Sequence, residues 1–145
     1  MKVEVSCMKV PIHVVAAAIH NHQGEILCAR RSQTMTLPGY WEFPGGKVDI
    51  DEATKIALTR EIGEELDCEI AVGSFIEETT HHYEEFTIRL ETYFATVQGG
   101  TMTALEHSEL KWVPWQGLRS LRWAPADIPA VERVMQLCKK DYMNN

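Results

Sequence analysis

The sequence lacks an apolar run long enough to cross a membrane, and it shows no signal peptide, internal repeat or low-complexity segment. It also lacks a linker-like stretch that would separate two folding units. A chain of 145 residues is typical of a single domain with a substantial core. We therefore expect one globular domain over residues 1–145 that has no membrane partner.

Paired cysteines and an excess of positive charge are missing as well. The four cysteines (Cys7, Cys28, Cys68 and Cys138) form no CxxC pair, which favours reduced thiols in the cytoplasm over a disulfide or zinc site. The formal net charge of -7 argues against a general nucleic-acid-binding surface. It does not exclude a nucleotide substrate, because a bound metal reverses the local field.

The most informative segment present is residues 45–68. Its central part, residues 52–66, is rich in helix-forming residues and free of proline, and it predicts a helix entered by a glycine-rich turn. Asp49 or Asp51 is expected to cap this helix, with Glu52 completing a capping box with Asp49. Spacing by three and four residues predicts a buried face made of Ile56, Thr59, Ile62 and Leu66.

The acidic residues of this helix are placed against its stability. Glu61 and Glu65 are four residues apart and repel each other on one face, which typically costs roughly 0.3 kcal/mol. Glu64 and Asp67 crowd the same C-terminal end, where the helix dipole is already negative. Either this is a solvated acidic end, or a divalent cation such as Mg²⁺ binds there.

The remaining pattern predicts strands joined by short turns. Apolar and β-branched runs predict strands at residues 11–20, 25–31, 69–78, 83–97 and 110–113. Other segments predict a hairpin turn at 21–24, a loop at 32–40, a strand end at Gly99-Gly100, and an edge strand or an unpaired start at 1–8. An amphipathic helix is predicted at 126–139, near the end of the chain. Its buried side is expected to consist of Ile128, Val131, Val134, Met135 and Cys138.

The spacing of the central segment resembles the Nudix box. Gly46 is followed after five residues by Glu52, and after seven more by the run REIGEE at residues 60–65. The resemblance implies an α/β Nudix fold, an α/β/α sandwich with a mixed β-sheet between helices. It also implies an enzyme that hydrolyses nucleoside diphosphates linked to another group. Asp67 stands where the family usually has Gly, and we expect it to end the helix in a left-handed conformation.

The resemblance implies a metal site for Mg²⁺, with Mn²⁺ as a substitute. Glu64 and Glu65 match the principal metal ligands of the family, Glu61 assists them, and the carbonyl of Gly46 joins them. Glu106, in a later loop, resembles the additional metal-binding glutamate of MutT-type enzymes. The general base stays open among Glu61, Glu65 and Glu106.

Three further positions of the box shape the site in the family. Arg60 orients the glutamates and belongs with the catalytic residues, whereas Glu52 braces the loop and Gly45 is structural. Structural roles are the preferred interpretation for Arg60 and Glu52.

Three other stretches resemble MutT-type pyrophosphohydrolases, the third being similar to the bacterial CTP pyrophosphohydrolases. They are residues 30–31, 41–47 and 124–129. The resemblance implies that Phe43 and Asp127 contact the base, Arg31 lies near the phosphates or sugar, and Lys47 contacts a phosphate. Core packing, helix capping and solvent exposure are the alternatives for Phe43, Asp127 and Lys47. Pocket lining or a surface turn explains His81, His82 and Tyr83 equally well.

The expected activity is metal-dependent hydrolysis of a nucleoside triphosphate to a monophosphate and pyrophosphate. Asp127 stands where MutT carries an amide, which favours CTP-type or a broader range of modified or oxidised nucleotides as substrates. Two alternatives stay open: a hydrolase of nucleotide sugars or dinucleotides, and a non-catalytic nucleotide-binding module. We expect a cytoplasmic monomer or homodimer whose partner is the small nucleotide substrate.

Overall fold

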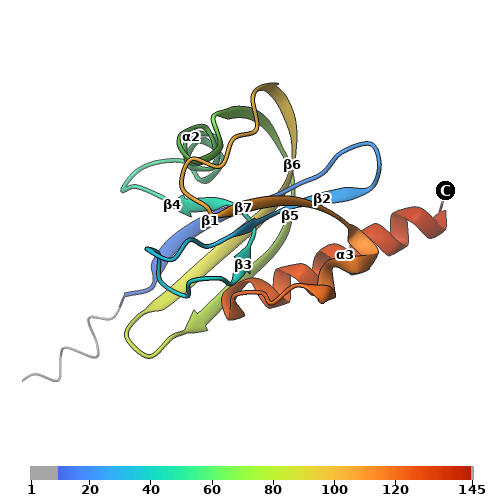
Figure 1. The fold of residues 1–145 in the computed structure, drawn as a ribbon. Coiled ribbons are helices and arrows are strands. Elements are labelled where there is room, and N and C mark those ends of the chain that lie inside the picture. The colour runs from blue at the N-terminus through green and yellow to red at the C-terminus, as the bar shows by residue number, and fades with distance from the viewer. Residues whose placement is uncertain (1–9, 145) are drawn as a thin grey trace, which may run out of the picture.

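The computed structural model describes residues 10–144, and it arranges two β-sheets between two α-helices (Figure 1). The edge strand predicted at residues 1–8 lies outside the described residues, as does Cys7. One sheet has the strand order β4 (Gly45–Lys47), β1 (Ile12–Ile19), β6 (Thr87–Gly100), β5 (Cys68–His82), and the other has the order β3 (Trp41–Glu42), β2 (Glu25–Arg30), β7 (Glu109–Pro114). The helices are α2 (Thr54–Leu66) and α3 (Ile128–Asn144), with 3-10 turns at Trp115–Ser120 and Pro125–Asp127.

Strand β1 lies at the centre of the first sheet. It pairs antiparallel with β4 and parallel with β6, so this sheet is mixed. Residues 15–19 are almost fully buried, because one face of the strand packs toward α2 and the other toward α3. A strand covered on both faces is expected to be continuously apolar, which is why this segment could be recognised in the sequence.

The core is divided between the two faces of the sheets. Leu58, Ile62 and Leu66 of α2 pack on the β1 face that carries Val15. Residues of α3, including Val134, pack against the opposite face of β1, which carries Ala16 and Ala18. The helices therefore cover opposite sides of the sheets, as Figure 1 shows, and the predicted α/β/α sandwich with a mixed sheet is confirmed.

The start and the buried face of α2 differ from the prediction. The N-cap residue is Ala53, which makes no side-chain capping bond, so capping by Asp49 or Asp51 is wrong. Asp49 and Glu52 instead close a turn before the helix, since the Asp49 N–H donates to the Glu52 carboxylate at 3.0 Å. Ile56 is 64% exposed, and Thr59 is exposed and donates to a backbone carbonyl of its own helix. The buried face is Ala57, Leu58, Ile62, Glu65 and Leu66.

The end of α2 agrees with the prediction. Asp67 has φ 53° and ψ 44°, a left-handed conformation, and its N–H donates to the carbonyl of Gly63 at 3.1 Å. Asp adopts the left-handed conformation at modest cost in free energy. The helix therefore ends in the geometry that Gly usually provides at this position.

Several strand limits also need correction. Gly45 and Gly46 lie in strand β4, paired with β1, and not in a turn. Strand β5 continues to His82, and β6 begins at Thr87 and continues to Gly100, because antiparallel pairing persists from Cys68↔Gly100 to His82↔Thr87. The pairing of β5 with β6 is interrupted by register shifts between residues 69 and 77, which are β-bulges or similar irregularities.

The last helix begins two residues later than predicted. Pro125–Asp127 form a 3-10 turn, and Ile128, expected on the inner side, is 46% exposed at the first position of α3. Val131 and Val134 are buried as predicted, and Met135 and Cys138 pack against them.

None of the helices in residues 10–144 is both long and apolar enough to span a bilayer.

Candidate active site

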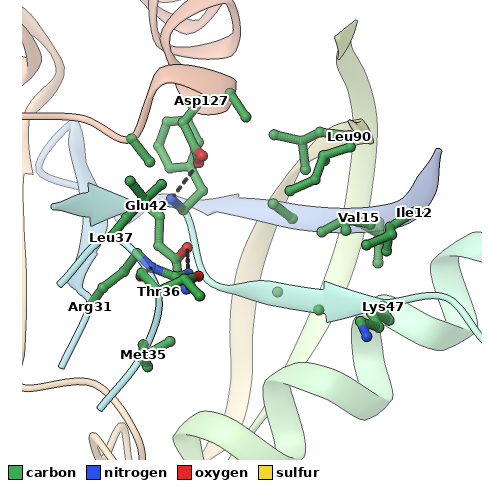
Figure 2. Close-up of a pocket in the computed structure, with 18 of the residues that line it drawn as sticks. Ile12, Val15, Arg31, Met35, Thr36, Leu37, Glu42, Lys47, Leu90 and Asp127 are labelled. Carbon is green, nitrogen blue, oxygen red and sulfur yellow. Dashed lines mark hydrogen bonds and ion pairs between the residues drawn. The ribbon is translucent and has the colours of Figure 1, made fainter. Parts of the chain in front are cut away.

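A cavity of about 420 Å³ lies against the face of the mixed sheet that belongs to the α3 cluster (Figure 2). Its lining is largely aliphatic and aromatic, with Val14, Ala16 and Leu90 from the sheet and Phe43 from the connection between β3 and β4. Gly46 and Glu65 also line it. The cavity therefore reaches from an apolar wall to the segment that carries the box.

Asp127 and Phe43 are joined inside this cavity. Asp127 is 6% exposed, and its Oδ2 accepts a hydrogen bond of 3.0 Å from the Phe43 backbone N–H. Oδ2 of Asp127 is therefore bound by the backbone of a distant segment, the connection between β3 and β4. Burial, followed by the neighbouring Glu42 carboxylate, raises the pKa of Asp127. Phe43 is buried and packs on Trp123, with ring centroids 4.9 Å apart, so it is a core residue as well as a lining residue.

Arg31 lines the cavity but is held by protein groups. Its Nη1 lies 2.6 Å from Glu42 Oε1, its Nη2 donates to Thr36 Oγ1 at 2.8 Å, and its Nε donates to the Thr36 carbonyl. Figure 2 shows this guanidinium between Glu42 and Thr36. The structure thus gives Arg31 a role in holding the loop at residues 32–40, which the sequence did not suggest.

Lys47 is exposed and lies at the opposite end of the cavity lining from Asp127 (Figure 2). Of the three residues expected at the hairpin junction, Tyr83 lines the cavity, whereas His81 and His82 do not. The Tyr83 hydroxyl accepts a 3.0 Å hydrogen bond from the Ala126 N–H, which ties the hairpin to the turn before α3.

Arg60 connects the acidic residues of the box. Its Nε and Nη2 donate to the two oxygens of Glu52 at 2.9 and 3.0 Å, and its Nη1 donates to Glu61 at 2.8 Å. Longer contacts of 3.4 Å join the same nitrogen to Glu64, and Nη2 also reaches the Lys47 carbonyl at 3.1 Å. The Arg60 hydrogen bonds lower the pKa of Glu52 to about 2. One guanidinium therefore joins α2 to the loop that precedes it.

Other atoms approach the two glycines of β4 so closely that neither position has room for a side chain. A Cβ at Gly45 would lie 1.9 Å from the carbonyl oxygen of Val15, inside the strand pairing. A Cβ at Gly46 would lie 2.1 Å from Oε1 of Glu61. The carboxylate of Glu61 is thus pressed against the backbone of Gly46, and the two predicted ligands are brought together.

Glu65 has the most unusual environment in the box. It is 8% exposed, and in the described part of the chain its Oε1 has no hydrogen-bond partner. Burial is the main cause that raises its pKa to about 9, followed by the charges of Glu42, Glu106 and Glu61, with backbone hydrogen bonding from Gly45 acting in the opposite direction. A buried carboxylate among other carboxylates is a site that a cation would stabilise.

The protein side chains alone do not form a closed metal cage. Within residues 10–144 no three His, Cys, Asp or Glu side chains converge closely enough to form one. Hard divalent cations nevertheless suit this set of oxygen donors, since Mg²⁺ keeps several waters and takes substrate phosphates as further ligands. The unpartnered oxygen of Glu65 is the observation that fits such an ion.

Glu106 lies near Glu65 although the two residues are far apart in the sequence. The N–H of the preceding residue, Leu105, donates to the Glu65 carbonyl at 3.1 Å. The side chain of Glu106 is exposed, and its charge contributes to the raised pKa of Glu65. The structure therefore brings the predicted distant glutamate to the box.

Sequence reasoning missed two residues that adjoin this site. Glu42 lines the cavity, and its Oε2 lies 2.8 Å from Nε2 of the buried His107. In the sequence Glu42 lies within the stretch 41–47, and His107 directly follows Glu106. A polar loop such as residues 104–109 gives no periodic pattern from which burial of one histidine could be inferred.

Comparison with known proteins agrees with this architecture. The model of the NUDIX domain matches residues 15–133. The chain is 38% identical over 123 residues to the CTP pyrophosphohydrolase of Escherichia coli, covering 85% of this chain and 91% of that protein. It is 25% identical over 126 residues to the 8-oxo-dGTP diphosphatase of the same organism, covering 87% and 98%.

Among solved structures, the chain resembles MutT, a Nudix-family hydrolase, from methicillin-resistant Staphylococcus aureus 252. The TM-score is 0.73 and the identity 46%, over 89% of this chain and 98% of that one. The family model covers most of the chain, and the relatives match nearly from end to end. This chain therefore belongs to the Nudix family.

Proposed function

We propose that this protein is a metal-dependent nucleoside triphosphate pyrophosphohydrolase, which converts a nucleoside triphosphate and water to a monophosphate and pyrophosphate. The observation that carries the proposal is the buried Glu65 carboxylate with an unpartnered oxygen, at a cavity that also contains Asp127. The region around Glu65 suits a cation with bound phosphates, and the region around Asp127 suits a nucleobase. The relatives named for activity on CTP and on 8-oxo-dGTP support this substrate class.

The cation would be held by carboxylates and one backbone oxygen. Glu64 and Glu65 are the proposed principal ligands, and Glu61, Glu106 and the carbonyl of Gly46 are the proposed additional ones. Mg²⁺ is the proposed ion, with Mn²⁺ as a substitute, and when bound it supplies charge neutralisation at the phosphates and a more acidic water.

The chain's own groups position this chemistry. Arg60 holds Glu61 and Glu52 in fixed orientations, and its positive charge offsets the repulsion between their carboxylates. A carboxylate of the site accepts a proton as water bonds to phosphorus and the P–O bond of the anhydride breaks. Glu61, Glu65 and Glu106 are the proposed candidates for that general base.

The base region is proposed to lie between Phe43 and Asp127. The Phe43 N–H occupies Oδ2 of Asp127, which leaves Oδ1 for an N–H or amino group of a base. Burial and the neighbouring Glu42 carboxylate raise the pKa of Asp127, so its carboxyl holds a proton more tightly than a free aspartate does. This arrangement supports CTP-type and modified or oxidised nucleotides as substrates.

The proposal is tested by measuring pyrophosphate release from normal, methylated and oxidised nucleoside triphosphates, with and without Mg²⁺. Glu64→Gln and Glu65→Gln should each lower turnover by about 10²-fold or more, as expected when a group that acts in the transition state is removed. Glu69→Gln, the same change at an exposed glutamate of β5, should leave turnover intact.

Three outcomes would contradict the proposal in different ways. No release from any nucleotide would favour a binding module. Turnover confined to nucleotide sugars or dinucleotides would favour the other enzyme class. Full activity in either glutamine variant of the box would contradict the metal-site assignment.

A further inference from the structure

The loop at residues 101–108 is fastened to the site along its length. Thr103 N–H donates to the Leu66 carbonyl at 2.8 Å, and Leu105 N–H donates to the Glu65 carbonyl at 3.1 Å. At the other end, Ser108 N–H donates to the Arg30 carbonyl at 2.9 Å. Between these attachments the loop carries Glu106 and His107.

His107 is the one side chain of this loop that the described structure buries deeply. Its side chain is 0% exposed, whereas its neighbour Glu106 is exposed. Its Nε2 lies 2.8 Å from Oε2 of Glu42, and Nδ1 has no hydrogen-bond partner in the described residues. The orientation of the ring is therefore set by a single polar contact with Glu42 and by packing.

Glu42 joins this loop to a second one. While Oε2 faces His107, Oε1 accepts from Arg31 at 2.6 Å, and Arg31 in turn holds Thr36 in the loop at residues 32–40. The carboxylate of Glu42 is 15% exposed and lines the cavity. One partly buried acid therefore connects two loops that border the site, each through a cationic or N–H donor.

We propose that His107 is a positioning residue that acts through Glu42 to hold Glu106 at the metal site. The inference rests on the proposed function, because it assumes that Glu106 contributes to cation binding. On one side of Glu106 the backbone is fixed by the Leu105–Glu65 bond, and on the other by the His107–Glu42 bond. A loop carboxylate that is already restrained loses less conformational freedom when it binds an ion.

The test measures Mn²⁺ binding to the nucleotide-free protein by the electron paramagnetic resonance of the free ion. His107→Leu removes the N–H donor, whereas His107→Gln keeps an N–H that can reach Glu42. We expect His107→Leu to weaken Mn²⁺ binding about tenfold and His107→Gln to remain within about threefold of wild type, as outer contacts of metal sites do. Glu69→Gln, at an exposed glutamate of β5 outside this loop, should leave binding unchanged.

A second comparison identifies the route of the effect. If His107 acts by positioning Glu106, His107→Leu should weaken Mn²⁺ binding no further in a protein that already carries Glu106→Gln. With Mg²⁺ in turnover assays, the concentration for half-maximal rate should rise for His107→Leu, while kcat at saturating Mg²⁺ is largely retained. A purely structural lesion would lower kcat and the thermal midpoint instead.

Three results would overturn the inference. They are unchanged Mn²⁺ affinity in folded His107→Leu, an equal further loss in the Glu106→Gln background, and unchanged affinity in Glu106→Gln alone. If His107→Leu does not fold, Glu42→Gln replaces it: a several-fold loss of Mn²⁺ affinity supports the inference and an unchanged affinity overturns it. Because Mn²⁺ binding needs no turnover, a failure of pyrophosphate release would contradict only the proposed function.

Discussion

The backbone N–H of Phe43 donates a 3.0 Å hydrogen bond to Oδ2 of Asp127, a residue 84 positions further along the chain. This buried bond fastens the connection between β3 and β4 to the turn before α3. Both residues line the cavity, so the bond fixes the shape of the region proposed for the base as well as the packing of α3 on the sheets.

The first prediction concerns the stability that this bond provides. Asp127→Ala leaves the buried Phe43 N–H without a partner and should lower the free energy of unfolding by about 1–3 kcal/mol. Asp127→Asn keeps an acceptor and should cost less than about 1 kcal/mol. Urea unfolding measures both, with Asp141→Ala at an exposed position of α3 as the control. Equal losses for Ala and Asn would show that the bond contributes little.

The second prediction concerns pH. Burial raises the pKa of Asp127 in the native state, so the native protein binds this proton more tightly than the unfolded chain does. The associated stability is complete below the ordinary pKa of 3.8 and is lost as pH rises through the native pKa. Asp127→Asn lacks this loss, so its stability relative to wild type should improve as pH rises. A constant difference between pH values would contradict the raised pKa.

The third prediction separates stability from activity at Glu65. This carboxylate is buried beside other acids and has an oxygen without a partner in the described residues, so it opposes folding when no cation is bound. Glu65→Gln should raise the free energy of unfolding of the metal-free protein by about 1–2 kcal/mol, while it removes Mg²⁺-dependent turnover. Thermal unfolding in EDTA measures the first effect. A less stable metal-free variant would show that Glu65 is stabilising by itself.

The fourth prediction compares two glycines of the box. A Cβ at Gly46 would lie 2.1 Å from Glu61 Oε1, so Gly46→Ala should displace that carboxylate and weaken Mn²⁺ binding and turnover. Gly63 lies inside α2, where the nearest atom to a Cβ is 4.0 Å away. Gly63→Ala should therefore leave activity intact and stabilise the helix by about 0.5–1 kcal/mol. Similar activities for the two variants would contradict the close approach of Glu61.

The fifth prediction concerns Asp67, which ends α2 with φ 53°. Asp67→Gly relieves the left-handed strain but increases the freedom of the unfolded chain, so the net change should stay within about 0.5 kcal/mol. Asp67→Ala keeps the strain without the polar side chain and should lower stability by about 1 kcal/mol. Thermal unfolding of both variants measures the difference. A strongly stabilising Asp67→Gly would show that Asp is a poor substitute at this position.

The sequence was sufficient for features that local pattern determines. The apolar run of β1 reflects burial on both faces, and the left-handed end at Asp67 follows from helix geometry. The local sequence pattern was insufficient where tertiary contacts determine the backbone conformation. Gly45 and Gly46 read as a turn, but pairing with β1 makes them a strand, because only residues without a Cβ fit against Val15 and Glu61.

The site shows the same division. Fixed spacing in the box was enough to indicate its acidic residues, because one turn of a helix places them together. The link from Glu42 to His107 spans 65 positions and joins a strand to an irregular loop, so no local pattern could reveal it. Asp127 was expected beside the base, but its bond to Phe43 depends on how α3 packs and could not be inferred.

Strand β1 turns alternate side chains toward α2 and toward α3, and in the described residues these helices pack in separate core clusters. The acidic residues of the box belong to α2, whereas Asp127 precedes α3. Inherited changes near Tyr83, Ala126 or Asp127 can therefore alter the wall of the cavity without repacking the helix that carries the carboxylates. Descendants of one ancestral gene could diverge in the nucleotide they accept while transmitting the same hydrolytic machinery.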